Sequence, residues 1–387
     1  MRIAAIRESS IPLNSSLRNA AFDFSEMTTS VVAVVTDVLR GGRPVAGFAF
    51  NSTGRYACGA QMRERFIPRL LKAPPETLVD DQGTLDPEKA LACMMQREKP
   101  GGHTERSVAI GTIEVALWDA VAKIADKPLH RVLAERYYPG TLPTKVPCYV
   151  GGGWYEPGKG LKDLQDEIRA KLDQGYRTMK IKVGGAAIPR DLERIEAALK
   201  VVESARHLAV DANGAFDRAR ALAYAQALAP YDLRWFEEPG DPLDFALLSD
   251  VAREYAAPLA TGENLFSTQD VRNLVRYGGL RADLDILQVD VPQSYGIAQF
   301  ARTVAMLESM GWGRKSLFPH GGNQMTLHVV GGFGLGGCEA YPGVFGIFAG
   351  FADDARVENG YMRLPERPGI GFEAQNALYA VMKDLAA

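Results

Sequence analysis

The fold is decided by four short stretches of sequence, MKIKVGG (179–185), LAVDANG (208–214), RWFEEPG (234–240) and LATGEN (259–264). Each is an apolar run with charged residues at or near its end. The pattern continues downstream, so that Lys182, Asp211, Glu237, Glu263, Asp290 and His320 follow one another at intervals of 26 to 30 residues. A strand, a loop and a helix of a parallel β/α repeat together take roughly 30 residues. The spacing predicts one functional side chain per repeat, always at the same end of a strand.

The same alternation extends from about residue 146 toward the C-terminus. The expected strands are 146–152, 179–185, 208–214, 234–240, 259–264, 286–292, 316–322 and 338–342, and helical segments such as 188–204, 218–229 and 297–310 lie between them. Strands that alternate with amphipathic helices form a parallel sheet, and eight of them close into a barrel of the α/β class. Active sites of such barrels lie at the carboxyl ends of the strands, where we expect the charged residues to converge.

The first part of the chain has a different pattern. VVAVVTDV (31–38), the turn GGRP (41–44) and VAGFAFNS (45–52) predict a hairpin, and the segment 107–129 predicts a long helix. We therefore expect a separate α+β unit before the barrel. The tail after about residue 357 resumes no β/α pattern, and we expect it to pack back on this first unit.

Composition and charge argue against several classes of function. The chain has 387 residues, of which 47% are apolar, and its net charge of −3 disfavours binding to nucleic acid or to an anionic membrane. The four cysteines are far apart and form no C-x-x-C motif, and the N-terminal MRIAAIRESS lacks the apolar core of a signal peptide. The uncharged run 321–338 is too rich in glycine to suggest a membrane span. A cytoplasmic protein is the expectation.

Three carboxylates in succession indicate a metal site. Asp211, Glu237 and Glu263 end consecutive expected strands, and neighbouring strands lie about 4.8 Å apart, so the three can share one cation. Oxygen ligands select Mg²⁺ or Mn²⁺ rather than Zn²⁺. A single acidic residue in such a loop often caps a helix instead. Strand alternation should turn Glu238 toward the opposite face.

Two basic groups flank these carboxylates. Lys180 and Lys182 lie two residues apart on one strand, so both point into the barrel mouth. Repulsion between ammonium groups about 6–7 Å apart is roughly 2.5 kcal/mol, which favours a neutral, basic Lys182. Nearby carboxylates oppose this effect, and salt bridges to Asp211 and its neighbours are the alternative. On the sixth and seventh strands, an Asp290 beside His320 would fix the tautomer of the ring and stabilise its cation.

Together these motifs resemble the enolase superfamily. The resemblance rests on K-x-K at 180–182, VDANG at 210–214, FEEP at 236–239, TGEN at 261–264, QVD at 288–290, PHGG at 319–322 and the helix at 113–134. It implies Mg²⁺ as cofactor and a modified TIM barrel, (β/α)7β, at 141–350, with an α+β capping domain formed by 1–140 and completed by 351–387. The pair Asp290 and His320, with no lysine on the sixth strand, resembles the mandelate racemase subgroup.

Three stretches of the first unit are similar to the D-tartrate dehydratases of this subgroup: SSLRNAAFDFSEMTTS (15–30), GFAFNSTGRYACG (47–59) and QREKPGGHTERSVAIGTIE (96–114). This likeness implies four substrate contacts, namely Asn19, Asn51, Lys99 and Tyr155. Lys99 would clamp the distal carboxylate of a diacid. Glu339 matches the electrophile that hydrogen-bonds the substrate carboxylate in the subgroup. Asn323 and Pro292 depart from the pattern and leave the exact substrate open.

The resemblance implies a hydro-lyase for a small α-hydroxy diacid or acid sugar, with D-tartrate converted to oxaloacetate and water. Lys182 would abstract the α-proton, Mg²⁺, Lys180 and Glu339 would stabilise the enediolate, and His320 would protonate the leaving β-hydroxyl. Because Lys182 and His320 would face each other, a racemase or epimerase is the nearest alternative. A dehydratase of another acid sugar, a non-catalytic binding barrel and a nicotinamide oxidoreductase are the others. We also expect a homo-oligomer, between a dimer and an octamer.

Overall fold

In the computed structural model, which describes residues 1–387, the β-branched run near the N-terminus forms the middle strand of an antiparallel sheet. The strands β1 (Ile3–Pro12), β2 (Thr28–Arg40) and β3 (Arg43–Phe50) pair in the order β1-β2-β3. The hairpin of β2 and β3 is the predicted one, and its turn contains Gly41 and Gly42, both with positive φ. β1 was not predicted, because its residues show no clear alternation of apolar and polar side chains.

One long helix connects this sheet to the barrel. α4 (Glu105–Ile124) packs so closely on β3 that a Cβ atom at Gly47 would lie 2.1 Å from a carbonyl oxygen of the helix. On the barrel side, the Glu114 carboxylate accepts a hydrogen bond from the backbone N–H of Ile297 at 2.7 Å. That residue begins α11 (Ile297–Ser309), so α4 caps a barrel helix and holds the two domains together. The same unit contains α1 (Gly59–Gln61), α2 (Ile67–Lys72), α3 (Pro87–Met94) and α5 (Leu129–Tyr137).

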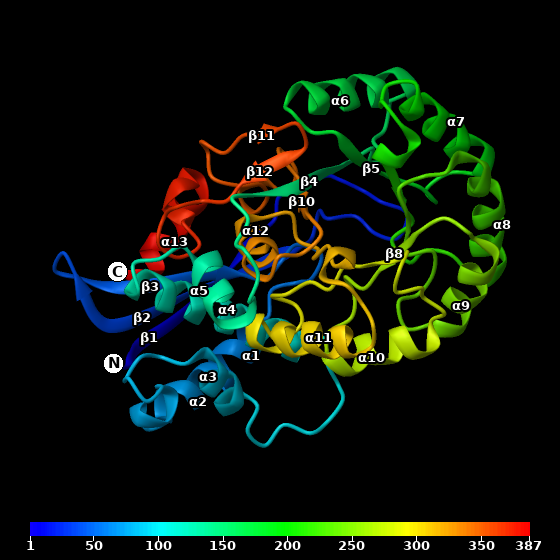
Figure 1. Ribbon diagram of the computed structural model, residues 1–387. Coiled ribbons are helices and arrows are strands. Elements are labelled where there is room, and N and C mark those ends of the chain that lie inside the picture. The colour runs from blue at the N-terminus through cyan, green and yellow to red at the C-terminus, as the bar shows by residue number, and fades with distance from the viewer.

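The β/α repeat closes into a barrel, as predicted. Its parallel strands are β4 (Lys145–Gly152), β5 (Thr178–Lys182), β6 (Leu208–Asp211), β7 (Phe236–Glu237), β8 (Leu259–Thr261), β9 (Ile286–Leu287) and β10 (Cys338–Ala340). The outer ring of helices consists of α6 (Leu161–Asp173), α7 (Ile188–Leu199), α8 (Arg218–Leu228), α9 (Phe245–Glu254), α10 (Thr268–Tyr277) and α11 (Figure 1). β4 to β9 pair in chain order, and β10 returns to pair with β4.

The seventh repeat is irregular. The stretch 316–322, expected as a strand, contributes a single parallel bridge between Leu287 and Leu317. Pro319 has no backbone N–H to donate to a longer ladder. The segment that follows, α12 (Gln324–Phe333), is a helix buried along its whole length. The predicted modified (β/α)7β barrel with a capping domain is therefore confirmed, with one strand reduced to a bridge.

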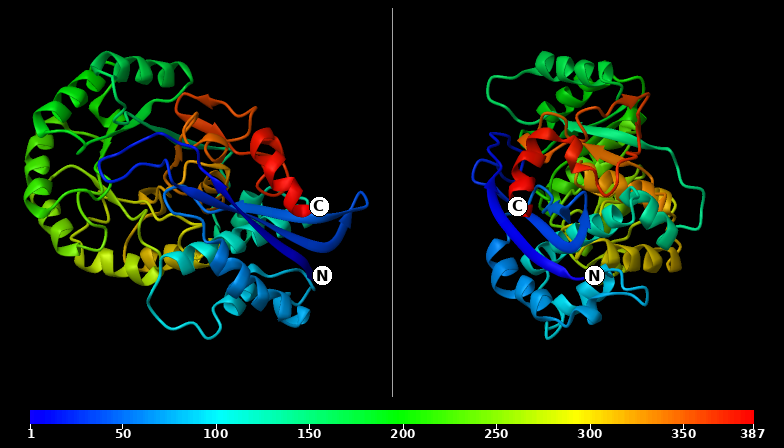
Figure 2. Two further views of the ribbon diagram at one scale, coloured as in Figure 1. Left: turned by 180° about the vertical axis from the view of Figure 1, so that it is seen from behind. Right: turned by 90° about the vertical axis from the view of Figure 1, so that its left-hand side faces the viewer.

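The C-terminal tail contacts both domains. β11 (Val357–Glu358) and β12 (Tyr361–Arg363) form a hairpin, and β12 pairs antiparallel with β4. α13 (Asn376–Ala386) then returns to the small sheet, where the Tyr379 ring lies 6.0 Å from the ring of Phe48. Both ends of the chain therefore lie beside the small sheet (Figure 2). No helix in the chain combines the length and the apolar character needed to cross a bilayer.

Candidate active site

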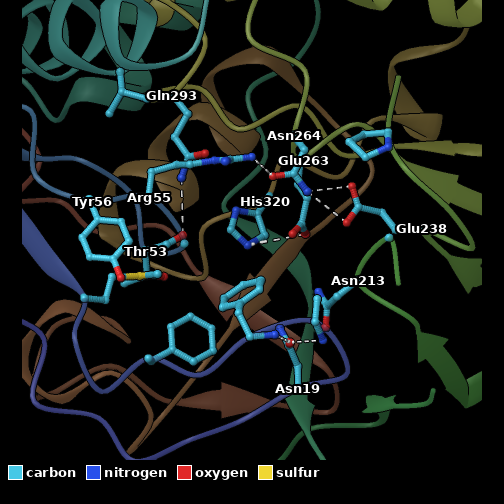
Figure 3. Close-up of a pocket in the computed structure, with 18 of the residues that line it drawn as sticks. Asn19, Thr53, Arg55, Tyr56, Asn213, Glu238, Glu263, Asn264, Gln293 and His320 are labelled. Atoms are coloured by element: carbon cyan, nitrogen blue, oxygen red, sulfur yellow. Dashed lines mark hydrogen bonds and ion pairs between the residues drawn. The ribbon is translucent and has the colours of Figure 1, made fainter. Parts of the chain in front are cut away.

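A cavity of about 540 Å³ lies between the two domains at the carboxyl ends of the barrel strands. The barrel lines it with polar side chains, among them Lys182, Asn213, Glu238, Glu263, Asn264 and His320 (Figure 3). The capping domain contributes two loops, 19–27 and 53–58, which carry Asn19, Phe24, Arg55 and Tyr56. Cavities of this size hold small organic ligands, and here the barrel wall is charged while the capping wall combines aromatic, polar and charged side chains.

Both lysines of the K-x-K motif are ion-paired. Lys182 Nζ donates a hydrogen bond to Asp211 Oδ2 at 2.5 Å. Lys180 Nζ lies 2.6 Å from Glu237 Oε1 and 2.7 Å from Glu339 Oε1. Burial lowers the pKa of Lys180, but these carboxylates outweigh burial and hold its pKa well above the ordinary value. The salt-bridged alternative therefore describes this arrangement better than mutual repulsion of the two lysines does.

Of the three carboxylates proposed as metal ligands, Asp211 and Glu237 end β6 and β7, and Glu263 lies two residues beyond β8. The register aligns Asp211 with Glu237 across β6 and β7. Burial, with the negative charges of Asp211 and Glu263, raises the pKa of Glu237 to about 8 against the effect of Lys180. A divalent cation offsets buried negative charge of this kind, and carboxylate oxygens suit Mg²⁺. As the side chains stand, Asp211 and Glu237 face the lysines, and no three acidic, histidine or cysteine side chains form a complete ligand set. Binding of one cation by all three carboxylates stays a prediction.

Glu238 lies in the cavity, contrary to the prediction from strand alternation. β7 ends at Glu237, and Glu238 adopts a left-handed backbone with φ of 42°. Its carboxylate oxygens accept hydrogen bonds from Asn264 Nδ2 at 2.9 and 3.0 Å. Burial and the neighbouring carboxylates of Glu263 and Asp211 raise the pKa of Glu238 well above its ordinary value. Alternation fails at this residue because it applies only to extended backbone.

Asp290 and His320 form a hydrogen-bonded pair. His320 Nδ1 lies 2.7 Å from Asp290 Oδ2, while Nε2 faces the cavity, 3.6 Å from Glu263 Oε2 (Figure 3). Burial lowers the pKa of His320, but Glu263 and Asp290 outweigh burial and raise this pKa to about 10. The ring is therefore a cation that can donate a proton from Nε2. The backbone N–H of Gln293 donates to Asp290 Oδ1 at 3.1 Å, and its side-chain amide donates to the Ser52 carbonyl at 3.1 Å, which ties this pair to the capping domain.

Glu339 is fully buried beside Lys180. Its Oε1 accepts a hydrogen bond from the Tyr341 hydroxyl at 2.6 Å, whereas its Oε2 is buried without a partner. Burial raises the pKa of Glu339, but Lys180 and His320 reverse that effect and hold the pKa below its ordinary value. In this arrangement Glu339 is an ionised acceptor and not the donor that the resemblance implies.

One of the four predicted substrate contacts lines the cavity. Asn19 does so, and its Oδ1 accepts backbone hydrogen bonds from the residues two and three positions ahead. Asn51 is buried, and its Oδ1 accepts a hydrogen bond from a backbone N–H of β2 at 2.5 Å. Lys99 is exposed, and Tyr155 lies in a neighbouring hollow, where its hydroxyl donates to Asp191 at 2.7 Å. Asn51, Lys99 and Tyr155 thus lie outside the cavity lining.

Among the cavity residues that sequence reasoning missed are Arg55, Asn264 and Trp154. Arg55 and Asn264 lie in motifs that were singled out, and Arg55 Nη2 donates to Asn264 Oδ1, but a motif does not give side-chain direction. The Trp154 ring centroid lies 4.7 Å from Lys182 Nζ, a cation–π contact that only the folded chain creates. Asn323, which departs from the family pattern, caps α12 by accepting a backbone hydrogen bond at 3.1 Å and does not line the cavity.

The chain is similar to a known protein family and to several known enzymes. Residues 163–378 match the family described as enolase C-terminal domain-like. The chain is 28% identical over 280 residues to arabinonate dehydratase of Saccharolobus solfataricus, covering 71% of this chain and 72% of that protein. It is 32% identical over 271 residues to 3,6-anhydro-alpha-L-galactonate cycloisomerase of Streptomyces coelicolor, covering 70% of each. The crystal structure of L-talarate dehydratase from Polaromonas sp. JS666, in complex with Mg and L-glucarate, matches with a TM-score of 0.75 and 26% identity over 96% of this chain and 94% of that one.

The matched region holds most of the barrel, including β5 to β10 and all the charged strand-end residues. The structural match covers almost the whole chain, so it includes the capping domain as well. Sequence motifs, topology and relatives agree, and the chain belongs to the enolase C-terminal domain-like family of the enolase superfamily.

Proposed function

We propose that this protein is a Mg²⁺-dependent hydro-lyase that removes water from an acid sugar, with D-tartrate, converted to oxaloacetate, as its substrate. The observation that carries the proposal is the placement of Lys182 and the Asp290–His320 pair around one cavity. Two relatives, the arabinonate and L-talarate dehydratases, are named for dehydration of acid sugars. The choice of D-tartrate rests on the resemblance of the loops 15–30 and 47–59.

The roles of the chain's own residues follow from their positions. Lys182 would first release its own proton to solvent and give up its contact with Asp211. As the neutral amine it would then accept the proton α to the substrate carboxylate. Lys180 would hold a fixed positive charge near the enediolate as it forms. His320 would donate its Nε2 proton to the β-hydroxyl, which leaves as water, while Asp290 holds the ring through Nδ1. The remaining enol tautomerises to the keto acid.

Asp211, Glu237 and Glu263 are the residues that would hold the metal ion. Support comes from the excess of buried carboxylates at these strand ends and from the Mg in the L-talarate dehydratase complex. When bound, Mg²⁺ supplies positive charge that offsets the charge of the substrate carboxylate. Mn²⁺ shares this preference for oxygen ligands.

The test is keto-acid release by EDTA-treated protein from D-, L- and meso-tartrate, arabinonate and galactarate, with and without added Mg²⁺. We expect D-tartrate to give oxaloacetate only when Mg²⁺ has been added. Oxaloacetate is measured as the oxidation of NADH by added malate dehydrogenase. If another acid sugar releases a keto acid and D-tartrate does not, the protein is still a hydro-lyase, but its substrate is that acid sugar. No keto acid from any of the compounds would refute the hydro-lyase.

An isomerase is the second candidate, because Lys182 and His320 both reach the cavity and can exchange protons on two sides of one carbon. The likeness to a cycloisomerase points the same way. Incubation with tartrate in D₂O separates the two reactions. An isomerase would incorporate deuterium into the recovered tartrate, would produce its other stereoisomer, and would release no keto acid.

Assembly into a homo-oligomer is a further proposal, which light scattering of the purified chain would test directly. A mass close to 42.1 kDa, that of one chain, would contradict it.

A further inference from the structure

The capping loop 53–58 places a single guanidinium against the cavity. Arg55 is half-buried, its Cζ lies 4.7 Å from the centroid of the Phe266 ring, and its Nη2 donates to Asn264 Oδ1. These contacts come from the barrel, whereas the backbone carbonyl of Arg55 accepts a hydrogen bond from Asn51 Nδ2 at 3.0 Å within the capping domain. The head group is therefore held at the junction of the two domains, on the cavity wall (Figure 3).

No carboxylate of the chain pairs with this guanidinium. The Nε–H of Arg55 is buried and donates to no group, and its one side-chain hydrogen bond goes to a neutral amide. Glu105 lines the same side of the cavity, but its carboxylate accepts a hydrogen bond from Thr104 at 2.5 Å and forms no ion pair with Arg55. The hydrogen bond from Thr104 and, to a smaller extent, the charge of Arg55 lower the pKa of Glu105, so Glu105 balances part of the guanidinium charge. Because no carboxylate pairs with Arg55 directly, its remaining donors can still bind an anion that the chain itself does not supply.

The other charges of the cavity limit where a second anion can bind. Glu238 and Glu263 make the barrel side acidic and would repel a carboxylate that reaches them without a cation. Lys182 and His320 pair with Asp211 and Asp290, and the proposed reaction uses both of them at the reacting carbons. Arg55 is left as a cation with free donors, and a guanidinium binds a carboxylate with two parallel hydrogen bonds.

We propose that Arg55 binds the second carboxylate of the substrate, the one remote from the reacting carbon, and so makes the enzyme selective for diacids over monoacids. This rests on the proposed function for the identity of the reaction, although the binding preference itself does not. Arg55 takes the role that the resemblance suggested for Lys99, whose side chain lies outside the cavity lining.

The test compares pairs of acids that differ only at the far end: tartrate with threonate, and galactarate with galactonate, each pair of matching stereochemistry. Dissociation constants are measured by calorimetry with Mg²⁺ in a Lys182→Ala background, so that turnover does not interfere. We expect the diacids to bind at least about 10-fold more tightly than the monoacids, and Arg55→Gln to weaken the diacids about 10- to 100-fold with little change for the monoacids. Arg55→Lys should retain part of the preference, because it keeps the charge without the paired donors.

The matched control is Arg63→Gln, which removes an equal charge from an exposed arginine of the same domain that pairs with Glu8. It should leave the preference unchanged. No diacid preference in the parent protein, an unchanged preference in Arg55→Gln, or loss of the preference in Lys99→Gln instead would each overturn the proposal. Diacid preference without keto-acid release would refute the proposed reaction and leave the role of Arg55 intact.

Discussion

At the scale of single residues, Lys182 carries the first step of the proposed reaction. We expect Lys182→Met, which keeps the apolar stem and removes the amine, to lower kcat by about 10²- to 10⁴-fold, the usual contribution of a positioned base. Exchange of the α-proton of the substrate with D₂O should disappear to the same extent. Proton NMR of the recovered acid measures that exchange, and rapid exchange by the variant would assign the base to another group.

Asp290 should affect only the second step of the proposed reaction, in which His320 protonates the leaving β-hydroxyl. Asp290→Asn replaces the acceptor of His320 Nδ1–H by an amide, which removes the anion that supports the charged ring. We expect dehydration to fall by about 10²-fold or more, while Lys182 continues to exchange the α-proton. Equal loss of exchange and dehydration would show that the pair does not act as the separate acid for the leaving hydroxyl.

The strand-end positions of these residues were predictable from spacing, but their partners were not. The intervals located Lys182, Asp211 and His320 at one end of the barrel, because a repeat of fixed length returns the chain to the same edge. The ion pairs of both lysines depend on which of several nearby carboxylates each ammonium reaches. The turn of Glu238 into the cavity depends on a single positive φ, for which the sequence FEEPG gives no signal.

At the scale of elements, α5 and α12 meet through two buried histidines. The backbone N–H of His130 donates to His328 Nδ1 at 3.1 Å, and His328 Nε2–H donates to the carbonyl of Ile370 at 2.9 Å, so the His328 ring is neutral. Burial lowers the pKa of His130 to about 4 and, with the neighbouring ring, that of His328 to about 3. Neither ring lines the cavity, so both histidines have a structural role.

These values predict loss of stability in acid. An unfolded histidine binds its proton near pH 6.5, whereas the folded rings stay neutral until about pH 4 and 3. The stability that the two histidines contribute is therefore complete above pH 6.5. It is lost progressively as the pH falls from 6.5 to about 4 for His130 and to about 3 for His328. At pH 5 the loss is roughly 2 kcal/mol for each histidine.

Urea unfolding at pH 7.5, 6 and 5 measures this effect, with His328→Gln as the comparison because it keeps a polar side chain that does not titrate. We expect the variant to be less stable at pH 7.5 and to lose less stability between pH 7.5 and 5. Parallel pH dependence of the two proteins would contradict the assignment to His328.

The regular elements were easier to predict than the irregular ones for a physical reason. Amphipathic helices such as α7 and α11 have a strong period and appeared at the expected positions. The stretch 316–322 is apolar enough for a strand, yet it forms a single bridge. β1 was missed because its sequence lacks a regular alternation of apolar and polar residues. It forms a strand through its antiparallel pairing with β2.

At the scale of the whole molecule, the end of the chain returns to the small sheet formed by its beginning. α13 packs on β2 with Leu378 and Met382 buried, so both termini hold the sheet whose loops cover the cavity. In the sequence, the barrel strands lie between this sheet and α13. We therefore expect stability of the cap and binding of the substrate to be linked through a helix that does not line the cavity.

Met382→Ala tests this link. Removing a fully buried methionine costs about 2–5 kcal/mol, and the loss should loosen the small sheet before it affects the barrel. We expect a lower melting temperature, faster proteolysis within the loops 19–27 and 53–58, and a higher KM for the acid substrate. The neighbouring, exposed Lys383→Ala is the control and should change none of these quantities. If Met382→Ala lowers the melting temperature but leaves KM and loop proteolysis unchanged, the tail stabilises the fold without governing the cover of the site.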